Sequence, residues 1–373
     1  PEKDLCLLKV QSPKPFAALK LGRSHDLMTG EPILCAGNPG GRGIVYSAGI
    51  VSSPSFILTA PNALVMRYFS GDVRDRFIQF DAASNQGNSG GPLINALGEQ
   101  VGVVSNKNYA EENINFAIPI DRVRQNLNEL FASEIRKGIF TGITLDPLAK
   151  KPKVIEVREG SPAAKLDIRP NDLLTSLSDK PLRNYLDWLA ALLQQKKGDE
   201  LNLTVSRSDK TRKLVLKLSA YPTPPTVKLK NPKPGLLFQV CHGRFDKAPN
   251  FDHQKVIKKG IAKSLDVHAM AAPKTDDFAI KLEGFLKIPT DGVYRLILNS
   301  DDGSVLRIGK DVIVDNDGPH PAQDVGTLLR LKKGYQRIQV DYFEATGDEE
   351  LSFFLEDASG KRESAEKFFF HEG

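Results

Sequence analysis

The stretch Gly87-Asn88-Ser89-Gly90-Gly91-Pro92 sets one serine between glycines, directly before the apolar pair Leu93-Ile94. A serine nucleophile needs an exposed Oγ and nearby backbone N–H groups that hold the developing oxyanion. A glycine two positions before the serine lets the backbone curl, so the Gly87 and Ser89 amides can converge on one point. The two glycines after the serine let other backbone approach closely. The same stretch also fits a glycine-rich turn without chemistry, and the flanking sequence has to decide between the two.

The segments around this turn decide between the two interpretations. Five segments in order resemble the HtrA/Deg serine proteases, which have the chymotrypsin-like fold: residues 4–9, 32–40, 47–52, 78–95 and 115–119. The resemblance implies that residues 4–9 form the strand that carries the family's triad aspartate, which is Asp4. It also implies Ser89 as the nucleophile. The amides of Gly87, Asn88 and Ser89 would form the oxyanion hole.

The histidine that such a triad needs as its base is missing from the expected place. In the family it precedes the aspartate, and only three residues precede Asp4 here. Of six histidines, only His25 lies in this part of the chain, where the family has an exposed loop. We therefore expect His25 to be a loop residue and not the base. Because the chain starts at Pro1 without an initiator methionine, we expect it to lack the first protease barrel and to be inactive by itself.

Composition fits a globular protein of several domains. The chain has 373 residues, of which 40% are hydrophobic and 26% charged, enough for two or three domains. The net charge of +5 comes from scattered lysines, which predicts no nucleic-acid surface. No apolar run approaches the roughly 18 residues of a membrane helix. The three cysteines lack metal-type spacing. We expect Cys6 and Cys35 to be buried thiols, with a Cys6–Cys35 bridge as the alternative.

The protease part ends in a helix, with Asp121 as the expected N-cap and Gly138 as its C-terminal stop. Residues 139–219 then follow the element order of an HtrA-type PDZ domain, including G-S-P-A-A-K at 160–165. Its helix start has Ser161 as cap and Pro162 at the first helical position. One departure is residues 166–172, which lack two glycines common in the family.

In such a domain a peptide C-terminus adds as a strand beside residues 142–145. The resemblance implies that backbone amides near Phe140, Thr141, Gly142 and Ile143 hold its carboxylate. Thr141 replaces the usual apolar residue of this loop, which leaves the peptide preference open. The alternative is a PDZ domain that only braces the protease.

A proline-rich linker follows at residues 220–235, with Pro222, Pro224, Pro225, Pro232 and Pro234. Such a composition predicts a stiff, semi-extended spacer. We expect it to keep the third domain away from the peptide groove.

Residues 236–373 contain several β-strand candidates, at 294–298, 305–308, 312–314, 336–342 and 351–355. They resemble the protective-antigen-type domain, most specifically at the S-D-D-G-S turn of residues 300–304. In sugar-binding members the paired aspartates of this turn, here Asp301 and Asp302, bind calcium, with Asn316 on a second loop. Carboxylate oxygens suit calcium, but aspartate turns also cap hairpins through their own backbone. We expect His320 to be a loop residue and not a ligand.

The sequence therefore predicts a mainly β chain. It would combine the second barrel of a trypsin-like protease domain (1–138), an α+β PDZ domain (139–219), the linker (220–235) and a protective-antigen-type sandwich or barrel (236–373). The resemblance implies an HtrA-like serine endopeptidase of the periplasm or cell exterior, which needs no cofactor for proteolysis. Its expected partners are unfolded or C-terminal protein segments and a glycan or cell-surface ligand. A homotrimer is implied for the full-length protein.

Two alternatives remain open. The chain could be a non-catalytic peptide- and glycan-binding protein on a decayed protease scaffold, and the missing histidine supports this reading. The third domain could also be a structural spacer only.

Overall fold

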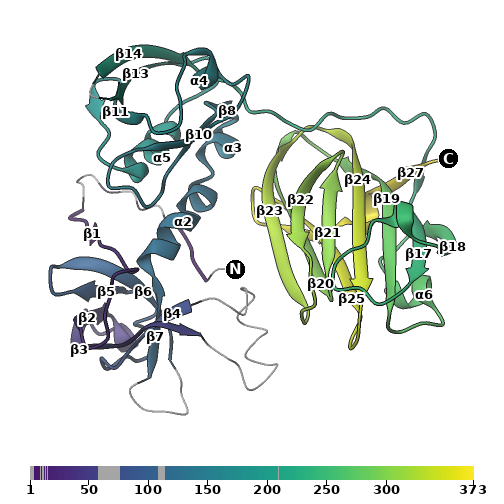
Figure 1. Cartoon of the computed structure of the whole chain (residues 1–373), viewed down its shortest axis with the longest axis horizontal. Helices are drawn as coiled ribbons and strands as arrows, with labels where there is room; N and C mark the ends of the chain where they lie inside the picture. Colours follow the sequence, from purple (N-terminus) through teal and green to yellow (C-terminus); the bar gives the residue numbers. More distant parts are fainter. Residues whose placement is uncertain are drawn as a thin grey trace.

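The computed structural model describes residues 4–8, 10, 12, 14, 16–57, 76–107, 114–208 and 210–373. These residues form three bodies joined in chain order, and strands predominate in them (Figure 1). The mainly β fold class is confirmed. None of the described helices combines the length and apolarity needed to cross a membrane.

The first body is a closed six-stranded barrel. Its strand order is β6-β5-β2-β3-β4-β7, and β7 pairs back with β6 to close the ring. A short β1 lies parallel to β6 outside the ring. Apolar side chains of alternate strand positions fill the interior, among them Val51, Ile78 and Leu93. The elements are β1 (Lys20–Leu21), β2 (Pro32–Gly37), η1 (Pro39–Gly41), β3 (Val45–Ile57), β4 (Arg76–Phe80), β5 (Pro92–Asn95), β6 (Glu99–Lys107) and β7 (Asn115–Pro119).

The segment before the barrel differs from expectation. Described residues 4–8 form no strand, because no neighbouring strand pairs with them there. Leu8 is 81% exposed. The prediction of a buried Cys6 is wrong, since Cys6 is exposed, whereas Cys35 is buried as expected. All three cysteines are free thiols, so the Cys6–Cys35 bridge is absent.

Two helices, α2 (Ile120–Phe131) and α3 (Ser133–Lys137), connect the barrel to the second body. They are separated at Ala132, which has φ 42°, and α3 ends at Gly138 with φ 66°. Asp121 is not the N-cap, which is Pro119. Instead Asp121 lies in the first turn and accepts hydrogen bonds from both backbone amides of Ser24 and His25, each at 3.0 Å.

The second body is the predicted PDZ domain. A four-stranded sheet of order β12-β11-β13-β14 and the pairs β9–β10 and β8–β15 surround a core that contains Trp188. Ser161 caps α4 by accepting from the Ala164 amide at 3.1 Å, as expected. Asp167 and Asn171, within residues 166–172, adopt positive φ of 57° and 76° although neither is a glycine. The elements are β8 (Ile139–Phe140), β9 (Ile143–Leu145), β10 (Val154–Val157), α4 (Pro162–Lys165), β11 (Leu173–Leu177), β12 (Lys180–Pro181), α5 (Tyr185–Leu192), β13 (Glu200–Arg207), β14 (Lys210–Lys217) and β15 (Ser219–Ala220).

The third body is a two-sheet β-sandwich. One sheet contains β16-β27-β19-β24-β21-β22, with β17 also paired to β19 and β18 paired to β17, and the other has the order β23-β20-β25-β26. Buried apolar residues from both sheets form one core. The elements are β16 (Pro232–Pro234), β17 (Leu236–His242), η2 (Phe251–His253), β18 (Val256–Ala262), α6 (Val267–Ala271), β19 (Phe278–Ile288), β20 (Gly292–Asp301), β21 (Ser304–Ile308), β22 (Asp311–Asn316), β23 (Gln323–Leu331), β24 (Gly334–Glu344), β25 (Glu350–Asp357), β26 (Arg362–Ser364), η3 (Ala365–Phe368) and β27 (Phe369–Glu372).

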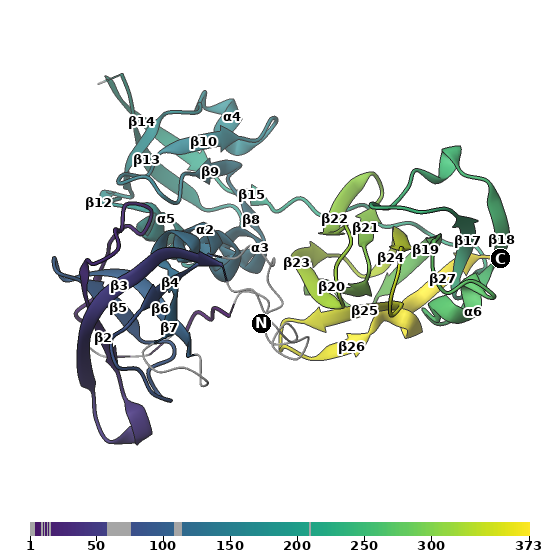
Figure 2. The same ribbon diagram turned by 60° about the horizontal axis from the view of Figure 1, so that its bottom comes forward.

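The linker does not hold the third body away from the PDZ domain, so that expectation is wrong. Val227 pairs with Tyr335, and the prolines of β16 join the sheet edge beside β27. Both views show β23 on the side of the sandwich that faces α3 (Figures 1 and 2). There the Arg330 guanidinium donates to the Ile135 carbonyl at 3.2 Å. The linker chain folds back along the sandwich, and this docks the third domain beside the peptide groove.

Candidate functional sites

Ser89 lies exposed on the turn that enters β5. Its Oγ donates a hydrogen bond to the Ser105 carbonyl at 2.9 Å. Gly87 has φ +108°, and a Cβ there would lie 2.7 Å from the Asn38 carbonyl oxygen, so only glycine fits. Gly91 is needed for close approach, because a Cβ would lie 2.2 Å from the Ala36 oxygen. At Gly90 a Cβ would meet no other atom, so glycine is favoured there only by the positive φ of +83°.

The three predicted oxyanion donors are not equivalent. The Asn88 amide already donates to the Asn85 carbonyl at 3.0 Å, which satisfies it inside the turn. The Gly87 and Ser89 amides have no acceptor in the described ranges. The buried Asn88 side chain packs against Gly37, where a Cβ would lie 2.1 Å from the Asn88 Oδ1. The turn therefore offers two amides, Gly87 and Ser89, to an oxyanion.

Asp4 is connected to Ser89 through Ser105. The Ser105 hydroxyl donates to Asp4 Oδ2 at 2.5 Å, while the Ser105 carbonyl accepts from Ser89. Sequence reasoning missed Ser105, because a serine in a strand has no local pattern that marks it. The arrangement brings the predicted nucleophile and the predicted acid to one strand, β6.

His25 is a loop residue, as expected. Its Nδ1 lies 2.7 Å from Asp121 Oδ2, and its side chain is 61% exposed. The other five histidines all lie beyond residue 241. Within the described parts of the chain, no histidine hydrogen-bonds to Ser89, so the structure presents no base to the Ser89 hydroxyl.

The PDZ loop is closed by an internal carboxylate. The Thr141 amide donates to Glu134 Oε1 at 2.9 Å, and the Thr141 hydroxyl donates to the same oxygen. The Ile143 amide donates to Thr141 Oγ1 at 3.1 Å. Burial raises the pKa of Glu134, partly offset by the two Thr141 hydrogen bonds. A Cβ on Gly142 would lie 2.1 Å from the Ser161 Cβ, which explains the glycine.

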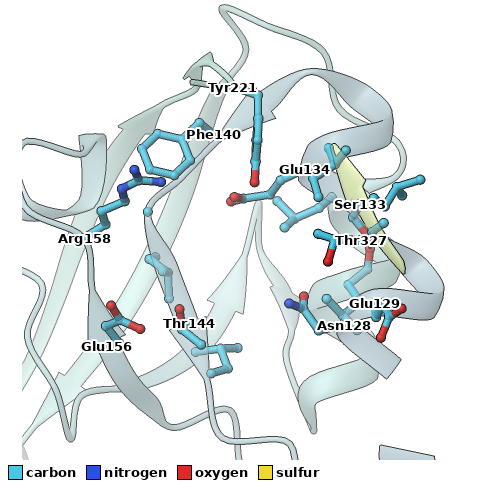
Figure 3. A pocket seen from close by; sticks show the side chains of 18 of the residues that line it. Asn128, Glu129, Ser133, Glu134, Phe140, Thr144, Glu156, Arg158, Tyr221 and Thr327 are labelled. Carbon is cyan, nitrogen blue, oxygen red and sulfur yellow. Dashed lines mark hydrogen bonds between the residues drawn. The ribbon is translucent and has the colours of Figure 1, made fainter. Parts of the chain in front are cut away.

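A pocket of about 850 Å³ lies beside this loop. Residues from three places line it: helices α2 and α3, the groove between β9 and α5 of the PDZ domain, and strands β22 and β23 of the sandwich. Figure 3 shows the Glu134 side chain reaching from α3 toward Phe140 and Tyr221. Phe140 packs edge-on against Tyr221 with ring centroids 6.0 Å apart. The sandwich thus forms one wall of the groove between β9 and α5.

A cluster of carboxylates lies in the sandwich. Single oxygens of Asp301, Asp302 and Glu344 all lie within 4.8 Å of one another. Asp302 accepts from the His320 and Ala345 amides, at 3.0 and 2.9 Å. These amides belong to other loops, so Asp302 does not cap its own turn.

The third carboxylate was missed by sequence reasoning. Glu344 is fully buried; its Oε2 accepts from the Tyr342 hydroxyl at 2.9 Å, and its Oε1 has no hydrogen-bond partner among the described residues. Burial, with the nearby Asp302 charge, raises the pKa of Asp301 to about 6. Burial raises the pKa of Glu344 to about 7. An uncharged or metal-bound state is favoured for such a cluster, and its hard oxygen donors fit calcium.

Asn316 and His320 lie close by, but their side chains form hydrogen bonds to groups outside the carboxylate cluster. The Asn316 side chain donates to Ser300 Oγ and accepts from Gln323 Nε2, each at 2.9 Å. The His320 ring bonds to the carbonyls of Asn316 and Pro321, as a loop residue does.

Three family models match the chain. They are the trypsin-like peptidase domain over residues 1–103, the PDZ domain over 140–218 and the PA14 domain over 232–367. The chain therefore joins a trypsin-like peptidase domain, a PDZ domain and a PA14 domain.

Part of the chain is similar to curated periplasmic serine endoproteases. The periplasmic serine endoprotease DegP of Escherichia coli K12 is 31% identical over 233 residues, which covers 58% of this chain and 47% of DegP. A probable periplasmic DegP-like serine endoprotease of Bartonella henselae is 28% identical over 260 residues, with 66% and 48% covered. The chain spans about half the length of these curated relatives.

Among solved structures, the serine endoprotease from Yersinia pestis aligns with 55% of this chain and 67% of its own, at 23% identity. The TM-score of that alignment is 0.24, too low to bear on the fold.

Proposed function

We propose that this chain supplies the nucleophile and the oxyanion hole of an HtrA-type serine endopeptidase that acts in the periplasm or outside the cell. The observation that supports this most is the Ser89 turn, where an exposed hydroxyl lies beside the unengaged amides of Gly87 and Ser89. Relatives named as periplasmic serine endoproteases support the reaction class and the location.

In the proposed reaction the Ser89 Oγ forms a bond to the scissile carbonyl carbon, and the carbonyl oxygen becomes an oxyanion held by the two amides. The Ser89 proton must leave with a base, because a hydroxyl is a weak nucleophile at neutral pH. A peptide carbonyl such as that of Ser105 accepts a hydrogen bond but is too weak a base to take the proton. We therefore propose that these 373 residues alone do not cleave peptides efficiently.

Casein hydrolysis tests both statements. The 373-residue chain and any longer form of the protein would be compared, each with its Ser89→Ala variant and with Ser264→Ala as an exposed control. We expect the chain itself to match Ser89→Ala, and a form that brings a histidine to Ser89 to cleave at least about 10³-fold faster. Equal rates for every form and its Ser89→Ala variant would contradict the protease proposal and favour the non-catalytic binding protein. Ser89-dependent cleavage by the chain alone would contradict the proposed inactivity.

We also propose that the PDZ groove binds peptide segments of unfolded or partly folded proteins. In the described part of the chain, β9 pairs only with β10, so its other edge is open to an added strand. The α5 side chains Tyr185, Trp188 and Leu189 line the facing side of the groove. An open strand edge beside an apolar helix is the arrangement that β-strand addition requires.

A second candidate function is calcium-dependent binding of a glycan by the PA14 domain. The observations that favour a cation are the buried Glu344 Oε1 without a partner among the described residues, and the short distances between carboxylate oxygens of Glu344, Asp301 and Asp302. An unpaired buried carboxylate is costly, and a bound cation would offset that cost. Asp301, Asp302 and Glu344 would supply ligands, and calcium would then offer open positions to sugar hydroxyls.

Calorimetry with CaCl₂ tests the cation first. Heat of binding that Asp301→Asn removes and Asp317→Asn retains would support the site. No heat with the unsubstituted chain would contradict it and leave the third domain as a spacer or docking module.

A further inference from the structure

The strongest unexplained contact is the one between Glu134 and the PDZ loop. Glu134 belongs to α3, which lies before the PDZ sheet, yet its Oε1 accepts from both the amide and the hydroxyl of Thr141. A carboxylate on loop amides is what a bound peptide C-terminus would provide. The chain therefore holds a carboxylate of its own in that role.

Thr141 makes this closure possible. It is fully buried, and its hydroxyl oxygen also accepts from the Ile143 amide at 3.1 Å. An apolar side chain at this position could make neither bond. Two of the three loop amides, those of Thr141 and Ile143, are thus satisfied from inside the protein, and only that of Gly142 has no acceptor among described residues.

The pocket beside the loop is acidic. Its described lining carries four carboxylates and a single guanidinium: Glu129, Glu134, Glu156 and Asp315 against Arg158. Glu129 is ion-paired with Arg295 at 3.5 Å, and Arg158 lies over the Phe140 ring at 5.7 Å from its centroid. No cationic side chain of the described ranges pairs with Glu156 or Asp315. Labels in Figure 3 mark Glu134 and Glu156 on opposite sides of the open space.

A peptide C-terminus would bring another negative charge into this pocket. It would compete with Glu134 for the Thr141 amide and face the exposed carboxylates of Glu156 and Asp315. Like charges disfavour each other more strongly near a protein surface of low dielectric than in water. A segment with Lys or Arg side chains would instead gain attraction from the same groups.

We propose that the groove between the PDZ and PA14 domains takes internal, basic segments of polypeptide and not free C-termini, with Glu134 closing the carboxylate loop. This inference rests on the proposed peptide binding and specifies its ligand. The segment adds to the open edge of β9. Side chains at alternate positions of that strand face the acidic groups of β10 and β22, because a strand has a repeat of two. The loop residues Phe140–Ile143 then act as a wall and not as an anion receptor.

The probe is a fluorescent acetylated peptide of about eight residues with alternating lysine and valine, a length that spans the groove. It is prepared with a free and with an amidated C-terminus, and a glutamate–valine peptide is the charge control. Anisotropy with the full chain should give affinities for the two lysine peptides within about threefold of each other. The glutamate peptide should bind at least about tenfold more weakly.

Two variants of Glu134 separate the effect of its hydrogen bonds to Thr141 from the effect of its negative charge. Glu134→Ala opens the loop, so the free-acid peptide should gain at least about tenfold over its amide. Glu134→Gln keeps an acceptor oxygen for Thr141, so indifference to amidation should persist while the lysine peptides bind more weakly. Glu159→Ala, an exposed substitution outside the pocket, should change neither result.

A wild-type preference of tenfold or more for the free C-terminus would overturn the inference. The inference would also be overturned if Glu134→Ala bound the free-acid peptide no more tightly than the amidated one. Removing Glu134 would then not have freed the loop to bind a carboxylate. If neither charge class binds the unsubstituted chain at millimolar concentration, peptide binding by the groove itself is wrong.

Discussion

The Ser105 hydroxyl donates a hydrogen bond of 2.5 Å to the Asp4 carboxylate, and this contact fixes the segment before the barrel to strand β6. Residues 5–8 form no strand in the structure, so side-chain contacts hold the segment there, namely this hydrogen bond and the packing of Leu5 against the cluster that contains Phe116. Ser105→Ala should therefore loosen it. We expect limited proteolysis within residues 4–8 to become at least about tenfold faster, the equivalent of one lost hydrogen bond to a charged group. Ser47→Ala, in another strand of the barrel, is the control, and an unchanged cleavage rate in Ser105→Ala would show that the contact does not hold the segment.

The glycines around Ser89 give a matched pair of substitutions. Gly87→Ala meets both a positive φ and the Asn38 carbonyl oxygen at 2.7 Å, whereas Gly90→Ala meets only a positive φ of +83°. We expect Gly90→Ala to cost about 1 kcal/mol and Gly87→Ala about 3 kcal/mol or more of barrel stability. Calorimetric unfolding measures both. Equal costs would mean that the clash at residue 87 is relieved by a small backbone shift.

The buried Asp172 should be important for the PDZ domain. Its carboxylate, 1% exposed, accepts from Arg207 Nε at 2.6 Å and from Nη2 at 2.9 Å, and also from the Arg169 amide at 2.9 Å. Asp172→Ala removes this acceptor from the Arg169 amide and from Arg207, whose guanidinium keeps its contacts with Asp167, and we expect a loss of about 2 kcal/mol.

Trp188 is the only tryptophan of the chain and is buried in this domain, so its fluorescence in urea reports the PDZ transition selectively. Glu200→Ala removes an exposed pair with Lys217, 3.6 Å apart, and should cost less than about 1 kcal/mol. A similar small loss for Asp172→Ala would contradict the prediction.

The carboxylate cluster predicts a pH-dependent stability of the PA14 domain. The pKa values of Asp301, about 6, and Glu344, about 7, lie above their usual values near 4. The folded state therefore holds these protons more tightly than the unfolded state. The protonated groups contribute fully to the free energy of unfolding below about pH 4, and this contribution is lost as pH rises through 6 and 7. Without calcium, we expect the domain to lose about 4 kcal/mol between pH 5 and pH 8, the larger part of it from Glu344.

Calcium should offset this loss, because it binds the ionised cluster. Calorimetric scans with and without about 5 mM CaCl₂ should show that calcium raises Tm more at pH 8 than at pH 5. Glu344→Gln should flatten the pH dependence in calcium-free buffer. A pH-independent Tm for the unsubstituted domain would contradict the raised pKa values.

Much of this molecule follows from local sequence. The glycine pattern around Ser89, the Ser161-Pro162 helix start and the alternating strands of residues 294–355 each depend on the geometry of a few adjacent residues. Backbone conformation, capping and strand alternation are local constraints, so they can be predicted from spacing alone. The mainly β class follows from the same strand alternation, whereas the order of the three domains was predicted from the resemblance of ordered motifs to known families.

Tertiary structure decided what the sites can do. Ser105, Glu134 and Glu344 reach their partners from positions that are distant in sequence or on another element, and nothing in their neighbours marks them. The occupied PDZ loop and the PA14 wall of the groove depend on how the linker folds back, which composition cannot specify. The sequence by itself determined the nucleophile turn, because short-range geometry sets it, and it indicated the three domain types through the resemblance of ordered motifs to known families. Only packing between distant elements determined which carboxylates are buried, paired or left for a ligand.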